Sequence, residues 1–432
     1  MHITVFEYGY IACDKQAEGE MGASCISSDA FHYLREVCLG AAESDLSRCL
    51  SLTKRHGVEL LQVKNYVGVI FTPGGECIEV LPKVGRHFNN TDNAPDYARQ
   101  VLLMMLSHLG SFRHIASHPA SVASQKMPLL EVFISQFLHS VNVLIKRGLK
   151  SDYVAQQDNL AFQKGKLLVA QQLRHNQVNK HKFYVEYDEF LINRPANRLI
   201  KSALVAIASQ TRMAANQKLL RELLFAFADV PVSPAIKQDV QSLKLDRSMT
   251  DYVSPLAWVK MILDGISPLA MKGQAEALSL LFPMEAVFES YVASVLSTQL
   301  PEGSLLTTQA QTEYLVTHKK RRQFQLKPDL VLTMREGSQT VMDTKWKLLD
   351  VDAYHYGLSQ SDLYQMFAYG HKYLHGSGSL FLIYPAHSRF NQPIECSFDF
   401  SETLRLWVVP FVIDLDGKSR VIWPSHNRLQ VS

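Results

Sequence analysis

The spacing of apolar residues changes twice along this chain, near residues 96 and 276, and that change limits what it can fold into. Residues 1–95 hold β-branched runs separated by turn residues, whereas residues 96–275 hold apolar residues at three- and four-residue spacing. Residues 276–432 mix both patterns. We therefore predict an α+β multidomain protein with a β-rich N-terminal region, a helical middle region and a C-terminal α/β domain around a mixed central sheet.

Several local patterns in the N-terminal region predict individual elements. Residues 3–12 favour a strand, and residues 29–52 favour one or two short helices. Two β-branched arms, 67–72 and 77–81, flank a Pro-Gly-Gly turn and predict a hairpin. The polar, turn-forming residues 85–95 predict a connection to the next region.

Helices should dominate the middle region and alternate with strands after it. The expected middle helices are 96–110, 127–149, 195–209, 216–228 and 255–264. Between them, residues 182–193 fit either a strand pair or a buried extended segment. In the C-terminal region we expect helices at 284–300 and 361–374, and strands at 326–334, 339–349, 379–385 and 404–414.

Composition excludes some classes of protein. The chain is 47% hydrophobic and 20% charged, as in ordinary globular proteins, and its net charge of +3 is too small to indicate a nucleic-acid or membrane partner by itself. None of the six cysteines forms a CxxC pair, which argues against a zinc ribbon. Neither a signal peptide nor a long uninterrupted apolar run is evident, so we expect a cytoplasmic protein that does not enter the membrane.

The C-terminal region carries a pair of acidic residues and a lysine on two predicted neighbouring strands. Asp329 follows Pro328 at the start of one strand, and Asp343 and Lys345 lie two residues apart on the next. Period-two geometry puts Asp343 and Lys345 on one face. Two carboxylates suit Mg²⁺ (or Mn²⁺), and an ammonium group can orient a water or neutralise charge on a phosphate. This PD-(D/E)xK pattern predicts metal-dependent cleavage of phosphodiesters.

The short pattern is weak evidence by itself, because the chain holds two similar sequences. Asp96 follows Pro95 at a predicted helix start, where it would act as a cap, and residues 416–418 read as an Asp-Gly turn. For Asp343 and Lys345 the alternative is a solvated strand face with paired charges. The apolar flanks on both strands favour a buried site instead.

Residues outside the two strands extend the candidate site. Gln365 and Tyr369 are four residues apart on the predicted helix and so share one face. Glu289, on the preceding helix, is a candidate third acid and metal ligand, and the alternative for it is a solvent-facing glutamate. We therefore predict Asp329, Asp343 and Glu289 as metal ligands, with Lys345 and Gln365 as further catalytic residues.

A basic run just before the acidic strands predicts contact with DNA. It includes Lys319, Lys320, Arg321 and Arg322, which could hold phosphates, and Lys347 and Tyr369 are further candidates for the same surface. The alternative is a solvated loop.

The ordered segments FESYVASVL, KPDLVL, DTKWKLL, DLYQMFAYGHKY and FLIYP resemble the nuclease domain of the McrC family of McrBC restriction systems. Upstream, VGVIFTPGGECIEVLPKV, RGLKSDYV, QKGKLLV and YDEFLINRPANRLIKSAL are also similar to that family, so the resemblance covers most of the chain. Residues 13–60 carry none of it. Asp rather than Glu at position 343 lies within the family's pattern.

The resemblance implies a nuclease subunit that works with an McrB-like hexameric AAA+ GTPase, stimulates its hydrolysis of GTP and cuts modified double-stranded DNA. GTP would be bound by the partner, in keeping with the absence of a GxxxxGK[ST] loop in this sequence. The N-terminal and middle regions would contact the ring. Two other functions stay open: a non-enzymatic subunit that activates a GTPase ring, and a stand-alone DNA-repair nuclease.

Overall fold

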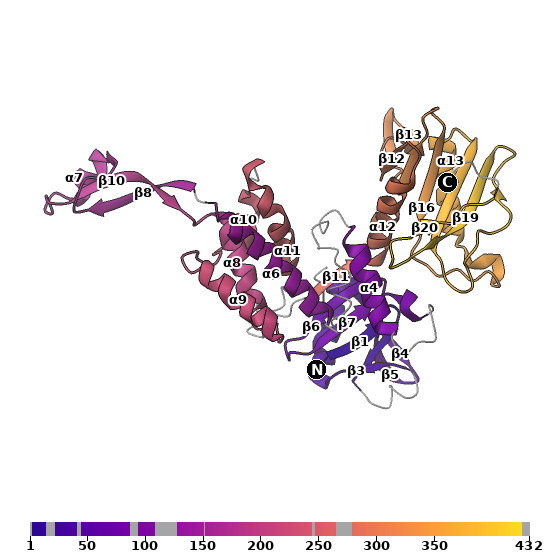
Figure 1. The fold of residues 1–432 in the computed structure, drawn as a ribbon, viewed down its shortest axis with the longest axis horizontal. Helices are drawn as coiled ribbons and strands as arrows, with labels where there is room; N and C mark the ends of the chain where they lie inside the picture. Colours follow the sequence, from indigo (N-terminus) through magenta and orange to yellow (C-terminus); the bar gives the residue numbers. More distant parts are fainter. Residues whose placement is uncertain are drawn as a thin grey trace. The chain divides into compact units, whose positions relative to one another are not determined.

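The computed structural model describes residues 2–13, 22–40, 45–86, 94–108, 128–150, 152–243, 247–264 and 279–425. The chain forms two compact units. Unit 1 combines Met1–Leu129 with Ser267–Ser432, and unit 2 is Leu130–Ile266. This division differs from the three predicted regions, because the helix α4 (Ala94–Leu106) falls in unit 1 with the N-terminal strands. The chain is a mixed α+β protein, as its apolar pattern predicted (Figure 1).

The N-terminal part of unit 1 contains two small sheets, ordered β1-β7-β6-β11 and β3-β2-β5-β4. Their strands are β1 (His2–Phe6), β2 (Tyr10–Ala12), β3 (Ser24–Cys25), β4 (Leu50–Arg55), β5 (Val58–Val63), β6 (Tyr66–Phe71), β7 (Cys77–Leu81) and β11 (Ser279–Pro283). Helices α2 (Ser28–Leu39) and α3 (Asp45–Cys49) and the 3₁₀ helix η1 (Lys83–Arg86) accompany them. Apolar residues from both sheets and from α2 form one core.

Most N-terminal predictions are confirmed, with two corrections. The predicted hairpin is β6–β7. The single strand predicted at 3–12 is wrong: Glu7–Gly9 form a turn, with Tyr8 at φ 61°, which divides β1 from β2. Residues 29–52 form helices only as far as Cys49, and β4 then begins. Of the connection predicted at 85–95, residues 87–93 lie outside the described residues.

Unit 2 is less purely helical than its sequence predicted. Its helices are α6 (Leu129–Arg147), α7 (Val169–His175), α8 (Pro195–Ile207), α9 (Ala214–Ala226), α10 (Ile236–Ser242), η2 (Arg247–Tyr252) and α11 (Val253–Asp264). A sheet ordered β8-β10-β9 joins them, formed by β8 (Asp152–Leu160), β9 (Lys166–Leu167) and β10 (Phe183–Leu191). Residues 182–193 therefore supply one strand, which pairs antiparallel with β8.

The helix α6 is long and apolar enough to cross a membrane by length and composition alone, and it is the only such helix among the described residues. Of its apolar window 56% is buried within the protein, and core helices of soluble proteins meet the same test.

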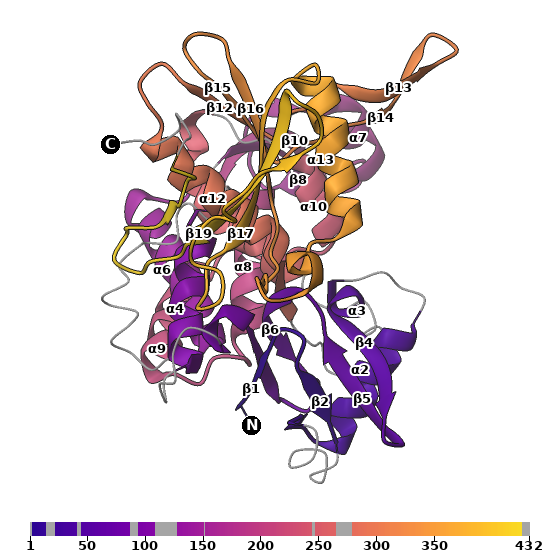
Figure 2. The same cartoon turned by 90° about the vertical axis from the view of Figure 1, so that its right-hand side faces the viewer.

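The C-terminal part of unit 1 is a seven-stranded mixed sheet, ordered β12-β15-β16-β17-β19-β18, with β20 also paired to β19. The strands are β12 (Leu305–Thr308), β15 (Leu330–Thr333), β16 (Gln339–Thr344), β17 (Gly378–Pro385), β18 (Phe398–Asp399), β19 (Leu404–Val412) and β20 (Arg420–Val421). Helices α12 (Met284–Gln299) and α13 (Gln360–Tyr373) lie on its two faces (Figure 2). A separate ribbon, β13 (Tyr314–His318) with β14 (Arg321–Gln325), precedes β15.

The last four residues of β16 are all buried, so both faces of this strand are covered. Val341 packs into the core that α13 covers, together with Met366 and Tyr369. The parallel pairing of β16 with β17 requires a crossover, and α13 supplies it. The chain makes this crossover directly after the predicted acidic residues, so α13 is brought back over them.

Candidate functional site

Asp329 and Asp343 lie where two neighbouring antiparallel strands of the C-terminal sheet meet. Asp329 comes directly before β15 and not within it, and Asp343 is the penultimate residue of β16. Asp329 Oδ2 accepts hydrogen bonds from the Thr344 backbone N–H and from the Thr344 hydroxyl, both at 2.7 Å. Thr344 thus fixes the carboxylate of Asp329, and Asp343, the residue before Thr344, supplies the second carboxylate.

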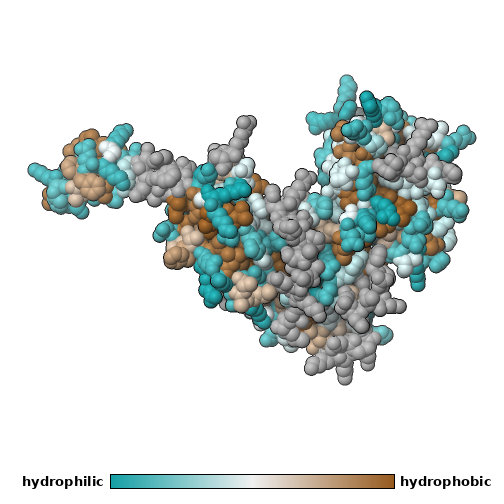
Figure 3. Space-filling model, viewed as in Figure 1, coloured by the Kyte–Doolittle hydropathy of each residue, from teal (hydrophilic) through white to brown (hydrophobic). Residues whose placement is uncertain are grey.

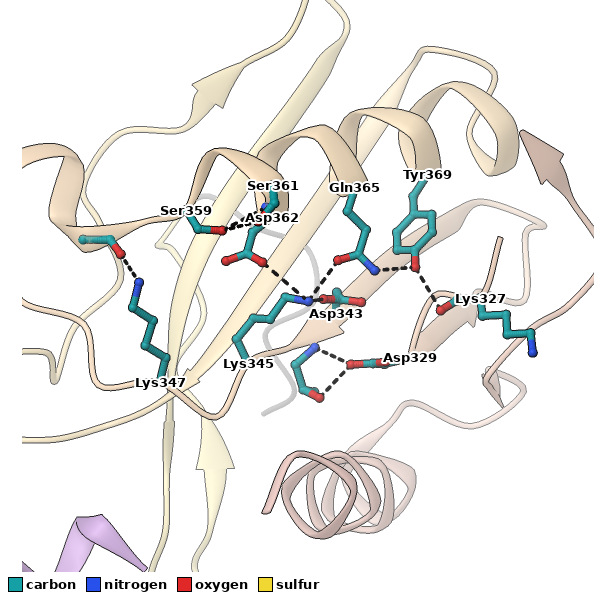
Figure 4. A network of polar contacts seen from close by, with 12 residues as sticks. Lys327, Asp329, Asp343, Lys345, Lys347, Ser359, Ser361, Asp362, Gln365 and Tyr369 are labelled. Carbon is teal, nitrogen blue, oxygen red and sulfur yellow. Dashed lines mark hydrogen bonds and ion pairs between the residues drawn. The ribbon is translucent and has the colours of Figure 1, made fainter. Parts of the chain in front are cut away.

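Lys345 reaches back to Asp343, although β16 ends one residue before it. The Lys345 Nζ lies 2.6 Å from Asp343 Oδ2 and 3.7 Å from Asp362 Oδ1, and it donates to Gln365 Oε1 at 3.0 Å. The Lys345 N–H donates to the Ile383 carbonyl at 2.9 Å, which continues the pairing with β17 for one more residue. The shared face predicted for Asp343 and Lys345 is therefore present (Figure 4).

Helix α13 completes the polar network. The Gln365 amide donates to the Tyr369 hydroxyl at 2.8 Å, which confirms that these residues share a face. Tyr369 in turn donates to the Lys327 carbonyl at 2.9 Å, two residues before Asp329. The network thus runs from Asp343 through Lys345, Gln365 and Tyr369 to the segment that carries Asp329 (Figure 4).

Burial raises the pKa of both aspartates in this site. The Asp343 side chain is 1% exposed, and burial together with the nearby Asp329 raises its pKa to about 7. Burial also raises the pKa of Asp329, against the lowering effect of Thr344 and Lys345. At Lys345, burial works to lower the pKa, but the surrounding carboxylates outweigh it and raise it. The ammonium group is therefore held in its charged form beside the two acids.

The donor set fits a divalent cation. Asp343 Oδ2 is buried with the Lys345 ammonium group 2.6 Å away, yet the nearby Asp329 still opposes ionisation of Asp343, because one lysine does not fully offset two buried carboxylates. Mg²⁺ takes one or two carboxylates and completes its shell with water and phosphate oxygens. Asp329 and Asp343 could hold such an ion.

Glu289, on α12, is a neighbour of this pair. Its carboxylate accepts a hydrogen bond from the Gln309 amide at 3.1 Å, and burial together with Asp329 raises its pKa to about 7. Within the described ranges, no three His, Cys, Asp or Glu side chains group closely enough to form a ready-made metal cluster. Glu289 is half-buried, and not solvent-facing. It lies close enough to Asp329 for the two charges to repel each other.

The basic run forms an exposed ribbon instead of an irregular loop. Lys319 and Lys320 make the two-residue turn between β13 and β14, both at positive φ, and Arg321 and Arg322 follow in β14. All four are exposed, and this end of the unit is largely hydrophilic in Figure 3. The ribbon is held at its base by α13, because the single hydroxyl hydrogen of Tyr373 is shared between the carbonyls of Ala310 and Leu326, at 3.0 and 3.2 Å.

Two residues predicted to contact DNA make hydrogen bonds within the protein. Tyr369 is 3% exposed and its hydroxyl is engaged, so it supports the network from inside. Lys347 donates to the Gly357 carbonyl and points away from Lys345 (Figure 4).

The similar sequences elsewhere do not form such a site. Asp96 lies in the first turn of α4 and not at its cap, and it pairs with Arg99. Residues 416–418 form an exposed turn, as predicted.

Sequence reasoning missed two polar neighbours of Lys345. Asp362 lies three residues before Gln365, so helical spacing could have placed it on the same face. Thr344, the middle residue of the Asp-Thr-Lys sequence, gave no signal, because its role depends on how β15 and β16 are paired.

Comparisons with known proteins agree with this architecture. Residues 61–385 match the family described as McrBC 5-methylcytosine restriction system component. No curated protein matches the chain.

Two solved structures from Thermococcus gammatolerans have a similar fold. A chain of the refined half-complex from a tetradecameric assembly of McrB AAA+ hexamers with bound McrC superposes with a TM-score of 0.67 at 18% identity, over 96% of each chain. A chain of the McrBC complex superposes with a TM-score of 0.50 at 20% identity, over 70% of this chain and 89% of that one. The family match spans well over half of the sequence and confirms the resemblance seen in its motifs: this chain belongs to the McrBC 5-methylcytosine restriction system component family.

Proposed function

We propose that this chain is the McrC-type nuclease subunit of a GTP-dependent restriction complex, and that its C-terminal sheet is a PD-(D/E)xK nuclease domain. The observation that carries the proposal is the convergence of Asp329, Asp343 and Lys345 at one sheet end, with the Lys345 Nζ 2.6 Å from Asp343 Oδ2. Buried carboxylates beside a charged lysine are costly for stability, so a functional reason for them is expected.

In the proposed reaction Asp329 and Asp343 hold Mg²⁺, with Glu289 assisting beside Asp329. The bound ion supplies Lewis acidity at the scissile phosphate. Lys345 keeps a positive charge next to the phosphate and donates a hydrogen bond to the attacking water or to a phosphate oxygen. Gln365 orients Lys345, and Asp362 balances its charge.

The substrate would be double-stranded DNA, in keeping with the 5-methylcytosine of the family's description. The basic ribbon supports DNA as the substrate, because exposed lysines and arginines contact phosphates without reading sequence. Five-residue strands reach about 17 Å, and a two-stranded ribbon fits a major groove. The ribbon ends at Gln325, a few residues before Asp329, so a duplex held there would lie near the carboxylates.

The partner would be an McrB-like AAA+ GTPase ring, as in the similar Thermococcus assembly. Large apolar side chains exposed on unit 2 support a protein contact there, including Phe162, Leu173 and Val178. Activation of the ring and cleavage of DNA can coexist in one chain. A stand-alone repair nuclease would instead cut without the partner.

The test is cleavage of methylated duplex DNA with the partner GTPase, GTP and Mg²⁺. Asp343→Ala should abolish cleavage while DNA binding persists. Asp416→Ala is a matched control, because Asp416 lies in the exposed Asp-Gly-Lys turn and should leave cleavage unchanged. Normal cutting by Asp343→Ala would contradict the proposed site, and cutting without the partner would favour the stand-alone nuclease.

A further inference from the structure

A buried polar cluster joins the N-terminal strands to the residue that follows Lys345. Glu7, just after β1, is 1% exposed, and Trp346 is 4% exposed. The indole N–H of Trp346 donates to both carboxylate oxygens of Glu7, at 2.9 and 3.1 Å. These two residues lie 339 positions apart in the chain, so the contact exists only in the folded unit 1.

Lys83 makes hydrogen bonds to both Glu7 and Trp346. Its Nζ donates to the Trp346 carbonyl at 2.7 Å, and its backbone N–H donates to Glu7 Oε2 at 3.0 Å. The ammonium group also lies over two aromatic rings, 5.0 Å from the centroid of Tyr8 and 5.4 Å from that of Trp346. Trp346 is therefore held at its side chain by Glu7 and at its backbone by Lys83.

Such a cluster fixes geometry at a cost in stability. Burial opposes charge on both partners: it raises the pKa of Glu7 to about 7 and lowers the pKa of Lys83. An apolar contact of the same size would stabilise the interface more, but it would not specify where the Trp346 carbonyl lies. The other face of Trp346 packs against Phe288 of α12, with ring centroids 5.1 Å apart.

The backbone fixed in this way is the one that carries Lys345. On its N-terminal side, Lys345 is held by its bond to Ile383 in β17. On its C-terminal side, β16 has ended and the pairing with β17 is over. The next peptide is then held by two bonds: its N–H, from Lys347, donates to the Lys345 carbonyl at 2.9 Å, and its carbonyl, from Trp346, accepts from Lys83 Nζ. A lysine side chain has four flexible carbons, so the place of its ammonium group depends on how firmly its backbone is anchored.

We propose that Glu7 and Lys83 are positioning residues for Lys345, acting through Trp346, so that cleavage depends on the docking of the N-terminal strands against the catalytic sheet. The inference rests on the proposed nuclease function. It assigns the N-terminal segment a part in catalysis in addition to any contact that it makes with a partner.

The experiment compares wild type with Lys83→Met, which keeps the length and apolar stem of lysine and removes only the ammonium group. In the full chain with partner, GTP and Mg²⁺, kcat for DNA cleavage should fall about tenfold, within the range for residues that orient a catalytic group, and KM for DNA should not change. Stimulation of the partner's GTPase should stay at the wild-type level, which measures how much of the protein is folded and assembled. Lys83→Arg, which keeps a cation and donors, should recover most of the lost rate.

Lys54→Met is the matched control, because Lys54 is an exposed lysine of β4 in the same part of unit 1, and it should cleave like wild type. If Lys83→Met leaves an unmatched Glu7 and folds poorly, the double variant Glu7→Gln/Lys83→Met removes both charges and should show the same loss of kcat.

Three outcomes overturn the inference: wild-type kcat in a variant without the ammonium group, a loss of GTPase stimulation in proportion to the loss of cleavage, or no recovery in Lys83→Arg. Asp343→Ala separates the two proposals. If Asp343→Ala cuts normally, the nuclease assignment itself fails, whereas if it is inactive and Lys83→Met is fully active, only the positioning role fails.

Discussion

At the scale of single residues, the candidate site places two buried carboxylates close together, which is unfavourable for the folded protein. Asp343 is buried beside Asp329, and both burial and the nearby Asp329 oppose its ionisation. Lys345 offsets part of this repulsion, yet the pKa of Asp343 still rises to about 7. The two buried acids therefore lower the stability of the folded protein.

Asp343→Asn should therefore make the protein more stable and less active at once. The amide has the same shape but no charge, and the raised pKa of Asp343 means that the fold favours the neutral form even beside Lys345, so we expect the free energy of unfolding without metal to rise by about 1–3 kcal/mol. Cleavage should fall by about 10²-fold or more. Thermal unfolding and single-turnover cleavage measure the two effects. Asp416→Asn should alter neither the free energy of unfolding nor the cleavage rate. If Asp343→Asn is less stable than wild type, the Asp343 charge does not destabilise the folded protein.

Glu7 should make stability depend on pH in a defined direction. Burial raises the pKa of Glu7 from 4.5 to about 7, so the folded protein binds this proton more tightly than the unfolded chain does. Its stabilising effect is complete below pH 4.5 and is lost as the pH rises through 7, by about 3 kcal/mol in all.

Glu7→Gln removes that titration and keeps an acceptor for Trp346. We expect the thermal midpoint of Glu7→Gln minus that of wild type to be more positive at pH 8.5 than at pH 5.5. Calorimetry of both proteins at both pH values measures this difference. Glu336→Gln, in an exposed turn, should follow wild type at each pH. A difference between Glu7→Gln and wild type that is the same at both pH values would contradict the prediction.

At the scale of elements, α13 organises the site. One helix supplies Gln365 to Lys345, Tyr369 to the segment before Asp329, and Tyr373 to the base of the ribbon. Its distance from the sheet is set by Gly370, because a Cβ at that position would lie 2.6 Å from Leu404 Cδ2 and 3.0 Å from Leu380 Cδ1.

Gly370→Ala should push α13 away from the sheet and weaken both fold and activity. We expect a loss of about 1–3 kcal/mol in the free energy of unfolding, as for other overpacked cores. Cleavage should fall with it, because Gln365 moves away from Lys345. Denaturant unfolding and cleavage assays test this. Gly74→Ala, where a Cβ would meet open space, should cost little.

The ribbon should control the dependence of DNA binding on salt. Lys319→Ala/Lys320→Ala should weaken binding to all duplex sequences alike and reduce the slope of log K against log salt by about 0.9 for each phosphate that the ribbon no longer neutralises. Fluorescence anisotropy over a salt series measures this slope.

Lys418→Ala/Arg420→Ala removes two exposed charges at the other end of the sheet, around β20, and should leave the slope unchanged. Equal slopes for both double variants would mean that the ribbon does not hold DNA.

The elements that could be predicted from sequence are those whose signal is local. The hairpin β6–β7 and helices such as α12 carry their own pattern, and the period of two correctly placed Asp343 and Lys345 together. Strand β12 was missed, because most of its side chains are exposed and give no apolar alternation. Asp362 and Thr344 join the site only through the packing of α13 and the pairing of β15 with β16.

At the scale of the whole molecule, unit 2 is an insertion into unit 1. The chain leaves unit 1 after Leu129 and returns at Ser267, and β11 then pairs with β6 before α12 begins. Contacts such as Glu7 with Trp346 connect the two outer segments and could not be predicted from either one alone.

This arrangement predicts that the two proposed activities can be separated. Asp343→Ala should leave stimulation of the partner's GTPase at the wild-type level, because the site lies in the C-terminal sheet and not in unit 2. A GTPase assay with purified partner, run beside the cleavage assay, measures this. Loss of both activities in a folded protein would mean that the carboxylate site and the ring-binding surface are coupled.

The pairing of β11 with β6 also has a consequence for how the chain is made. Strand β6 ends at Phe71 and β11 begins at Ser279, so about 200 residues are synthesised between them, which takes roughly 10–40 s at the usual rates of translation. The whole of unit 2 leaves the ribosome in that interval. The N-terminal sheet must therefore wait with one edge open, and an open edge is the kind of surface on which nascent chains mispair.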